Sequence, residues 1–350
     1  MRLPKLLFFL LLGLACWARN RPWSGWVDNC EIQGPRRSGS LILFPLSGSG
    51  ESLPRCRSLD SALMQEELLV REVREEGDVN RLVVENRGDR PVFIMAGEIL
   101  SGARQDRVLQ HDLWLPADSG EVTVAAYCVE HGRWGYKGGK RKFDSGGSIS
   151  NVRVRQAAMS ESGQGAVWDS VAETQKSNGV SSPSGALLVV YEDGRLSRRL
   201  DEIVNDLRDL PEDYPEMNGV AVQIDDRIVA VDVFPDRRLL VSLWPKLVRS
   251  YALEALSRET RQTALSRSQV RRFLDDFNNS SWRLIDTPGR GDLYSLHDGD
   301  LDGQALEQPE GLAHLQVLGW HRRRRPVRVD PSPWPPAIDL VKPTKPKVRY

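Results

Sequence analysis

The stretch from Gly97 to Trp134 constrains the fold most, because it contains two strand-like runs on either side of one turn. The turn is formed by residues 117–120, whose sequence Ala-Asp-Ser-Gly favours a tight reversal of the chain. Residues 107–115 before it and residues 121–130 after it are typical of strands. The sequence therefore predicts an antiparallel hairpin around which the rest of the domain is built.

The register of this hairpin follows from pairing the residues that lie nearest to the turn. Leu109 then faces Cys128, and Arg107 faces Glu130. Every second side chain of the later strand, at positions 122, 124, 126, 128 and 130, shares one face. The register predicts an ion pair between Arg107 and Glu130 at the mouth of a pocket. A shift of one residue would place the two side chains on opposite faces.

Polar residues at the ends of the stretch are the candidate site. The candidate catalytic residues are Glu98 and Glu130, and the candidate ligand-binding residues are Arg104, Gln105, Arg107, Arg133 and Trp134. Guanidinium groups bind anions, a carboxylate can act as a general base, and an indole ring can stack on a nucleobase or sugar. The same residues also fit surface ion pairs at strand ends, and their spacing alone favours that interpretation.

Cys128 is expected to be a packing residue, because it continues a row with Val122, Val124 and Ala126. The alternative is a nucleophile whose pKa a nearby arginine lowers. No metal site is predicted, since the chain contains no HxH, HExxH or CxxC spacing.

The N-terminus has the layout of an export signal, with Arg2 and Lys5 ahead of the apolar residues 6–14. Residues 1–18 are expected to be a signal peptide cleaved after Ala18, or a lipoprotein signal with Cys16 as the lipid-bearing residue. The protein is thus expected to be secreted, periplasmic or lipid-anchored at the cell envelope. Any membrane contact would then be made only through this segment.

The remaining cysteines are Cys30, Cys56 and Cys128, and the first two are the better candidates for a disulfide. The chain has 48 basic and 48 acidic residues, so no global charge favours a nucleic-acid partner. An anionic small molecule remains a possible ligand, and the sequence identifies no cofactor.

The periodicity predicts an α+β fold, with a largely antiparallel sheet or sandwich core and packed helices. Residues 19–35 are expected to be a linker, residues 36–320 one domain, and residues 321–350 a basic, proline-rich tail. Strands are predicted at residues 40–46, 70–76, 80–86, 91–95, 219–225, 227–234, 289–296 and 312–320. Helices are predicted at residues 59–69, 154–176, 197–207 and 243–257. Residues 132–150 are expected to form a loop, and residues 186–191 a strand or a helix. The strands at 80–86 and 91–95 are expected to pair with each other.

Two motifs, GEILSGARQDRVL and YCVEHGRWGY, resemble the ARPP-1 domain family, which is named for its association with ADP-ribosylglycohydrolases and rhodanese-phosphatase proteins. The resemblance runs from about Pro35 to Trp320. It implies signature positions at Gly97, Glu98, Gly102, Gln105, Arg107, Cys128, Glu130, Arg133 and Trp134. Asp106 stands where the family usually has an asparagine. The resemblance also implies a link with ADP-ribose or other nucleotide-derived metabolites.

Three functions remain open from the sequence. The first is an exported domain that binds an anionic, nucleotide-like or ADP-ribose-like ligand. The second is a hydrolase in which Glu98 or Glu130 is the general base. The third is a structural interaction module. If the candidate residues converge on one concave pocket, the first two are favoured, and if they scatter, the third is favoured.

Overall fold

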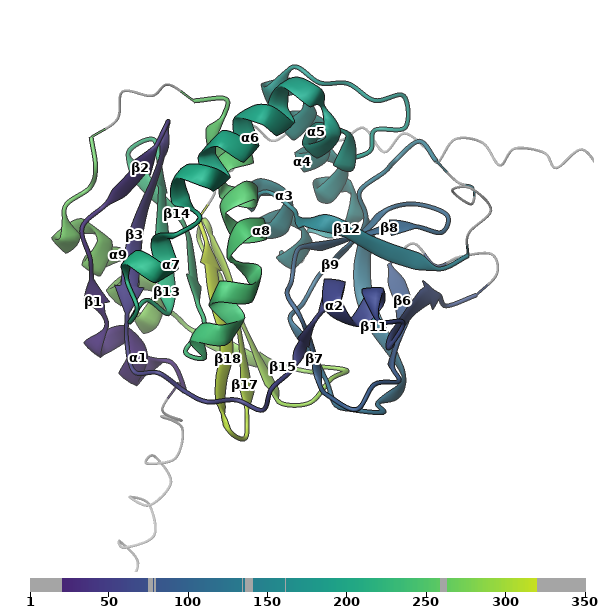
Figure 1. Cartoon of the computed structure of the whole chain (residues 1–350), viewed down its shortest axis with the longest axis horizontal. Helices are drawn as coiled ribbons and strands as arrows, with labels where there is room; N and C mark the ends of the chain where they lie inside the picture. Colours follow the sequence, from purple (N-terminus) through teal and green to yellow (C-terminus); the bar gives the residue numbers. More distant parts are fainter. Residues whose placement is uncertain are drawn as a thin grey trace, which may run out of the picture. The chain divides into compact units, whose positions relative to one another are not determined.

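The computed structural model describes residues 21–74, 78, 80–133, 135, 141–160, 162–258 and 263–319. These residues form an α+β fold of largely antiparallel sheets with helices packed against them, as the sequence predicts (Figure 1). The predicted export signal and the predicted tail at residues 321–350 lie outside the described residues. No helix of the described part is both long enough and apolar enough to cross a membrane.

The large sheet runs in the order β1, β3, β13, β14, β18, β17, β16, β15, and β2 also pairs with β3. Its strands are β1 (Glu31–Ile32), β2 (Arg36–Ser38), β3 (Leu41–Ser47), β13 (Gly219–Ile224), β14 (Arg227–Val233), β15 (Trp282–Ile285), β16 (Asp292–Asp298), β17 (Leu301–Gln308) and β18 (Gly311–Leu318). The predicted strands that correspond to β3, β13, β14, β16 and β18 are confirmed. Strand β17 was not predicted, because buried polar residues such as Gln304 break its apolar pattern.

A second sheet runs in the order β12, β8, β9, β11, β6, β5, and we call it the half-barrel. Its strands are β5 (Leu68–Glu72), β6 (Arg81–Asn86), β8 (Glu98–Gly102), β9 (Arg107–Leu109), β11 (Gly120–Cys128) and β12 (Phe143–Ile149). A bridge between Arg71 and Lys142 brings its two outer strands together. A short sheet made of β10 (Leu113–Leu115), β7 (Val92–Ile94) and β4 (Arg57–Ser58) adds to its apolar core.

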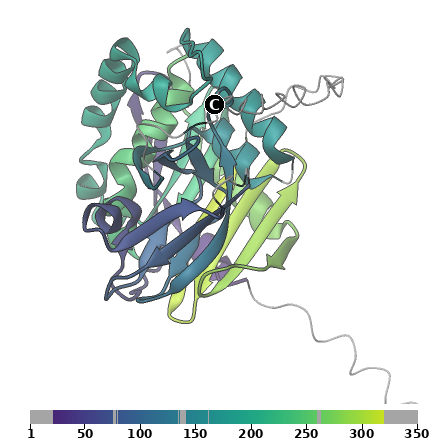
Figure 2. The same cartoon turned by 90° about the vertical axis from the view of Figure 1, so that its right-hand side faces the viewer.

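The helices cover both sheets. They are α1 (Ser24–Asn29), α2 (Leu59–Met64), α3 (Val152–Met159), α4 (Gly163–Asn178), α5 (Leu188–Glu192), α6 (Gly194–Leu207), α7 (Leu210–Asp213), α8 (Arg237–Ala255) and α9 (Arg267–Asn279). Helix α8 packs against β12 of the half-barrel and against β3 and β13 of the large sheet (Figure 1). Strands β16–β18 lie beside the half-barrel (Figure 2), and Gln304 on β17 donates a hydrogen bond to the Gln110 carbonyl at 2.8 Å.

Helix α8 begins earlier than its apolar pattern predicts. Asp236 caps it by accepting a hydrogen bond from the Arg238 amide at 3.0 Å, so the helix starts at Arg237. Pro245 therefore lies inside the helix and not in its first turn. Helix α6 likewise begins at Gly194, ahead of its predicted start at residue 197, because Asp193 supplies the cap.

The predicted hairpin is wrong, because residues 107–115 do not form one strand. Strand β9 pairs with β8 and β11, whereas β10 pairs with β7 in another sheet. The break falls between them at Asp112, whose buried carboxylate accepts a hydrogen bond from the Ala96 amide at 2.7 Å. This long-range contact bends the chain where local periodicity predicts continuity.

The register of the hairpin also differs from the prediction. Cys128 lies opposite Arg107, and Ala126 lies opposite Leu109, which is an offset of two residues. An offset of two keeps each side chain on its predicted face but changes its partner. Glu130 therefore does not lie opposite Arg107, and the predicted ion pair between them is wrong.

Four further predictions are corrected. Residues 24–32 of the predicted linker form α1 and β1, because Trp23 and Trp26 are buried against the large sheet. Strand β12 occupies part of the predicted loop at 132–150, and β7 pairs with β10 and β4 instead of β6. Cys30 and Cys56 are free thiols that pack in different apolar clusters, so they do not form the expected disulfide.

Candidate functional site

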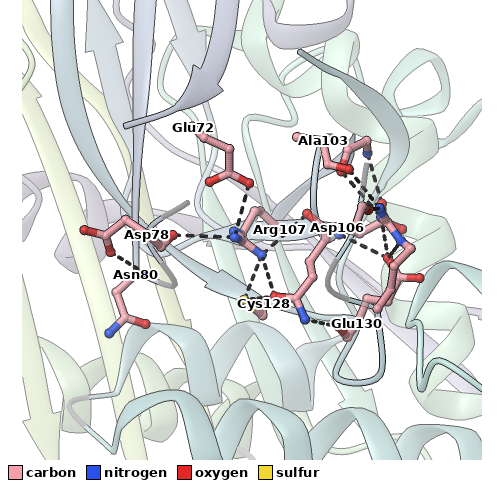
Figure 3. A network of polar contacts seen from close by, with 12 residues as sticks. Glu72, Asp78, Asn80, Ala103, Asp106, Arg107, Cys128 and Glu130 are labelled. Carbon is pink, nitrogen blue, oxygen red and sulfur yellow. Dashed lines mark hydrogen bonds and ion pairs between the residues drawn. The ribbon is translucent and has the colours of Figure 1, made fainter. Parts of the chain in front are cut away.

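One end of the half-barrel brings most of the candidate residues together, and we call this end the mouth. Strands β5, β8 and β11 end there, and strands β6, β9 and β12 begin there, because all neighbouring pairs are antiparallel. Three segments meet there, and their described residues are 72–74, 78 and 80–81 in the first, 102–107 in the second, and 128–133, 135 and 141–143 in the third. Figure 3 shows the polar contacts among them.

Arg107 lies at the centre of the mouth and is completely buried. One terminal nitrogen, Nη1, donates to Cys128 Sγ at 2.7 Å and to Gln105 Oε1 at 3.2 Å (Figure 3). The other, Nη2, lies 3.4 Å from a carboxylate oxygen of Glu72 and 3.5 Å from the Asp78 carbonyl. Its Nε has no hydrogen-bond partner in the described structure. The Arg107 side chain is therefore a buried cation that four polar groups hold at the centre of the mouth.

The Cys128 thiol is a poor nucleophile in this environment. Burial raises its pKa to about 11, and the opposing effect of the Arg107 cation does not restore the ordinary value. The thiol donates a hydrogen bond to Gln105 Oε1 at 3.0 Å, which fixes both side chains. The Gln105 amide in turn donates to the Glu130 carbonyl at 2.8 Å. The geometry assigns Cys128 the packing role that the sequence favours.

Glu130 and Arg133 form the outer part of the mouth. The Glu130 carboxylate accepts from Arg133 Nε at 2.8 Å and from the Asp106 amide at 3.2 Å. Burial alone would raise the pKa of Glu130, but hydrogen bonds from Arg133 and Ser184 outweigh burial and lower it. Arg133 also lies 3.1 Å from Asp106, and 19% of its side chain is exposed. Its Nη1 donates to the Ala103 and Gly135 carbonyls at 2.9 and 2.8 Å, so the guanidinium is a partly accessible cation that protein acceptors hold in a fixed orientation.

Helix α4 supports the mouth through its first turn. The Gln164 amide accepts from the Cys128 backbone N–H and donates to the Cys128 carbonyl, both at 2.8 Å. This side chain thus replaces a missing neighbouring strand at the end of β11. One turn later, the Trp168 ring packs edge-to-face on His131, with 4.3 Å between the ring centres. Gln164 and Trp168 therefore lie on the same side of α4, one turn apart.

Glu98 belongs to a different cluster. It is completely buried, and its carboxylate binds Lys246 Nζ of α8 at 2.5 Å and the Met95 amide at 3.0 Å. Lys246 also binds both oxygens of Asp60 on α2 at 3.0 Å. Burial raises the pKa of Glu98, and the Lys246 cation offsets only part of that effect. Glu98 therefore links the half-barrel to α8 and has no exposed surface.

The structure thus unites four of the seven candidate residues, namely Gln105, Arg107, Glu130 and Arg133. Arg104 lies half-buried in the same turn between β8 and β9, and its carbonyl accepts from the Gly135 amide at 3.4 Å. Trp134 lies outside the described residues. Sequence spacing did not identify Glu72, because only the curvature of the half-barrel brings β5 to Arg107.

A central polar network lies between the half-barrel and the large sheet, and it too was not predicted. Arg155 on α3 binds both oxygens of Asp232 at 3.2 Å, and Tyr251 donates to the same carboxylate. His314 lies between two carboxylates, at 2.7 Å from Asp112 and 3.2 Å from Asp232. All five side chains are completely buried. No spacing rule could reveal the network, because its residues come from five separate segments.

Burial and charge oppose each other within this central network. Burial alone would lower the pKa of His314, but Asp112 and Asp232 outweigh it and raise the pKa to about 9. Burial alone would raise the pKa of Asp232, but Arg155 and His314 outweigh it and lower the pKa. The network is therefore charged and internally compensated at neutral pH.

The comparisons with known proteins agree with the resemblance in the motifs. Residues 29–318 match the family model of ARPP-1, the ARG and Rhodanese-Phosphatase-superfamily-associated Protein domain. No curated protein and no solved structure matches the chain. Among the described residues, no group of three or more His, Cys, Asp or Glu side chains is placed to hold a metal ion.

Proposed function

The chain belongs to the ARPP-1 family, and on that basis we propose that its domain binds an anionic small molecule at the mouth of the half-barrel. The observation that carries this proposal is an excess of basic residues in the three segments that meet there. Their described residues include seven basic ones, Arg74, Arg81, Arg104, Arg107, Arg133, Arg141 and Lys142, and four acidic ones, Glu72, Asp78, Asp106 and Glu130. The complete segments contain nine basic and six acidic residues, so the excess is the same.

The contacts divide the mouth into two kinds of residue. Arg133 is partly exposed, so its charge would attract the ligand, while its three nitrogens already donate to Glu130, Asp106 and the backbone carbonyls of Ala103 and Gly135. Arg107 is buried and acts as a positioning residue, because its bonds to Cys128 and Gln105 fix the floor of the mouth. Gln105 then orients the backbone of Glu130, whose carboxylate holds Arg133. This arrangement supports an anion-binding site whose outer cation is preorganised.

The ligand class follows from the charge and from the family. Phosphate groups suit a basic mouth, because their negative charge is attracted to its cationic side chains. The family description associates this domain with ARG proteins and with the rhodanese-phosphatase superfamily. We infer a ligand that carries a phosphate or diphosphate, of which ADP-ribose is the first to test.

The two carboxylates are less suited to general-base catalysis. The Glu130 carboxylate is occupied by Arg133 and the Asp106 amide, and its pKa is lowered. Glu98 is held by Lys246 and has no exposed surface for a water molecule to approach. The geometry therefore supports binding at the mouth over hydrolysis by either residue.

Export is a further part of the proposal, and it rests on the sequence of residues 1–18. A positive region followed by a short apolar run is the signature of a segment that is removed after export. The ligand would then be met in the cell envelope or outside the cell.

A thermal-shift experiment with the full chain tests the binding proposal. ADP-ribose, ADP and ribose 5-phosphate are added at millimolar concentration, and we expect at least one to raise the Tm of the wild type. Arg133→Ala should remove that shift. The matched control is Arg290→Ala, which removes an arginine that pairs with Glu310 away from the mouth and should leave the shift unchanged.

Two results would contradict the proposal. One is the absence of a shift with all three probes on the folded wild-type protein. The other is an equal shift for the wild type and Arg133→Ala. If Arg133→Ala does not fold, Arg133→Lys provides the comparison, because it keeps the charge and loses the planar pair of donors.

A further inference from the structure

Three side chains on the large sheet, those of Ser295, His297 and Asp302, are joined in a row by hydrogen bonds. In the sequence they lie far from the residues of the mouth. Ser295 and His297 lie on β16, two residues apart, so their side chains share one face. Ser295 Oγ lies 2.9 Å from His297 Nε2, and His297 Nδ1 lies 2.7 Å from Asp302 Oδ1. Asp302 lies on β17 directly opposite His297. The order of contacts is that of a nucleophile, a base and the acid that orients the base.

Asp302 is held in place by a residue of another element. Gln156 of α3 donates to Asp302 Oδ2 at 2.8 Å and to the Asp300 carbonyl at 2.9 Å. One carboxylate oxygen therefore binds Gln156, and the other remains directed at His297. With the His297 proton on Nδ1 and donated to Asp302, Nε2 is free to accept from the Ser295 hydroxyl. The hydroxyl is thus paired with a base in a fixed tautomer.

A cavity lies in the same part of the fold, and its walls include none of Ser295, His297 and Asp302. It has a volume of about 450 Å³, and its walls include Leu109, Leu113, Val124, His111, Asp286 and Thr287. His111 links the cavity to the three residues, because its ring bonds to Gln304, which lies directly opposite Ser295. The buried His111 Nδ1 has no hydrogen-bond partner in the described structure. A cavity with an apolar wall and a few unused polar groups is the usual form of a small-molecule site.

We propose that Ser295, His297 and Asp302 form a second site that cleaves carboxylic esters. The site lies between the β16–β17 hairpin, helix α3 and the turn that follows β9. Arg283, which lies opposite Ser295 on the edge strand β15, provides a cationic side chain on the same face of the sheet.

The chemistry needs only the ester and water. Ser295 Oγ attacks the carbonyl carbon while its proton passes to His297 Nε2, and the carbonyl oxygen becomes an oxyanion. The bond between the carbon and the alcohol oxygen then breaks as His297 returns the proton to the departing alcohol. A water molecule repeats the two steps on the Ser295 ester and releases the acid. Asp302 stays ionised throughout and stabilises the His297 cation.

A fluorophosphonate probe tests the proposal directly. Such probes phosphonylate a serine oxygen that a neighbouring base activates, and fluoride leaves. We expect one adduct on Ser295 of the full-length wild-type protein, located by peptide mass spectrometry. His297→Gln should slow labelling at least about 100-fold, and Asp302→Asn by up to about 10⁴-fold. The same variants should lose hydrolysis of p-nitrophenyl acetate in parallel.

The matched control is Ser280→Ala, which removes another serine of the same region. Its hydroxyl donates to Asp298 at 2.8 Å and to the Asp276 carbonyl at 3.0 Å, so it is a half-buried serine that bonds to no histidine. This variant should be labelled at the wild-type rate. The absence of an adduct on Ser295 in folded wild-type protein would overturn the proposal, and so would equal labelling rates for the wild type and His297→Gln. In either case the three residues only stabilise the hairpin.

Discussion

The buried His314 makes a quantitative prediction about stability and pH. Its pKa in the folded protein is about 9, against an ordinary value of 6.5. Each pKa unit corresponds to about 1.4 kcal/mol, so the protonated His314 contributes roughly 3 kcal/mol to folding. Because the pKa is raised on folding, this contribution is complete below pH 6.5 and is lost as the pH rises through 9. The free energy of unfolding should therefore fall across that window.

Urea denaturation followed by tryptophan fluorescence at pH 6, 7.5 and 9.5 measures this effect. His314→Gln removes the titrating group. The effects of the titratable groups that both proteins share cancel when the free energy of unfolding of the variant is subtracted from that of the wild type. We expect the wild type to be more stable than the variant by about 3 kcal/mol at pH 6, and most of that gap to close by pH 9.5. A gap that stays constant across the three pH values would refute the argument that Asp112 and Asp232 stabilise the histidine cation. If the variant does not fold, a flat wild-type profile from pH 6.5 to 9 would refute it as well.

Two other predictions concern a glycine and the N-terminus. Gly97 has a φ of +90°, and a Cβ there would lie 2.7 Å from Arg155 Cδ, so Gly97→Ala should cost about 2–4 kcal/mol in urea denaturation. Gly165→Ala, on α4 with open space around it, is the control and should be no less stable than the wild type. On expression with its natural N-terminus, the mature protein should begin after Ala18 or carry lipid on Cys16, as mass spectrometry would show. An intact Met1 in the membrane-free, exported fraction would contradict cleavage.

The sequence predicted the class of fold and many of its elements, because those depend on local periodicity. The β13 and β14 strands and the α8 helix follow directly from their apolar spacing. Local patterns failed where a distant side chain determines the conformation. Asp112 shows this well, because its bonds to Ala96 and His314 separate β9 from β10.

The candidate site could be predicted only as a set of residues, and not as a set of contacts. Arg107 was placed on the correct face of its strand, but its partners are Cys128, Gln105 and Glu72 instead of Glu130. A two-residue offset preserves the alternation from which faces are predicted, so the sequence pattern cannot detect it. Glu72 enters the site only because the half-barrel curls, and curvature has no local signature in this stretch.

The stretch from Gly97 to Trp134 therefore contains two groups of residues with different roles. Gly97, Glu98 and Asp112 contact Arg155, Lys246 and His314, and these contacts join the half-barrel to the helices and to the large sheet. Gln105, Arg107, Glu130 and Arg133 instead bond to one another at the mouth. The first group is buried on every side, so its substitution should change the free energy of unfolding.

The second group should respond differently to substitution, because it ends in the partly exposed cation of Arg133. A residue that contacts solvent can exchange its water for a ligand, whereas Glu98 has no water to exchange. Loss of Arg133 should therefore change binding more than folding. The close spacing of the two groups in one motif reflects their positions on neighbouring strands of the half-barrel, and does not imply that they share one pocket.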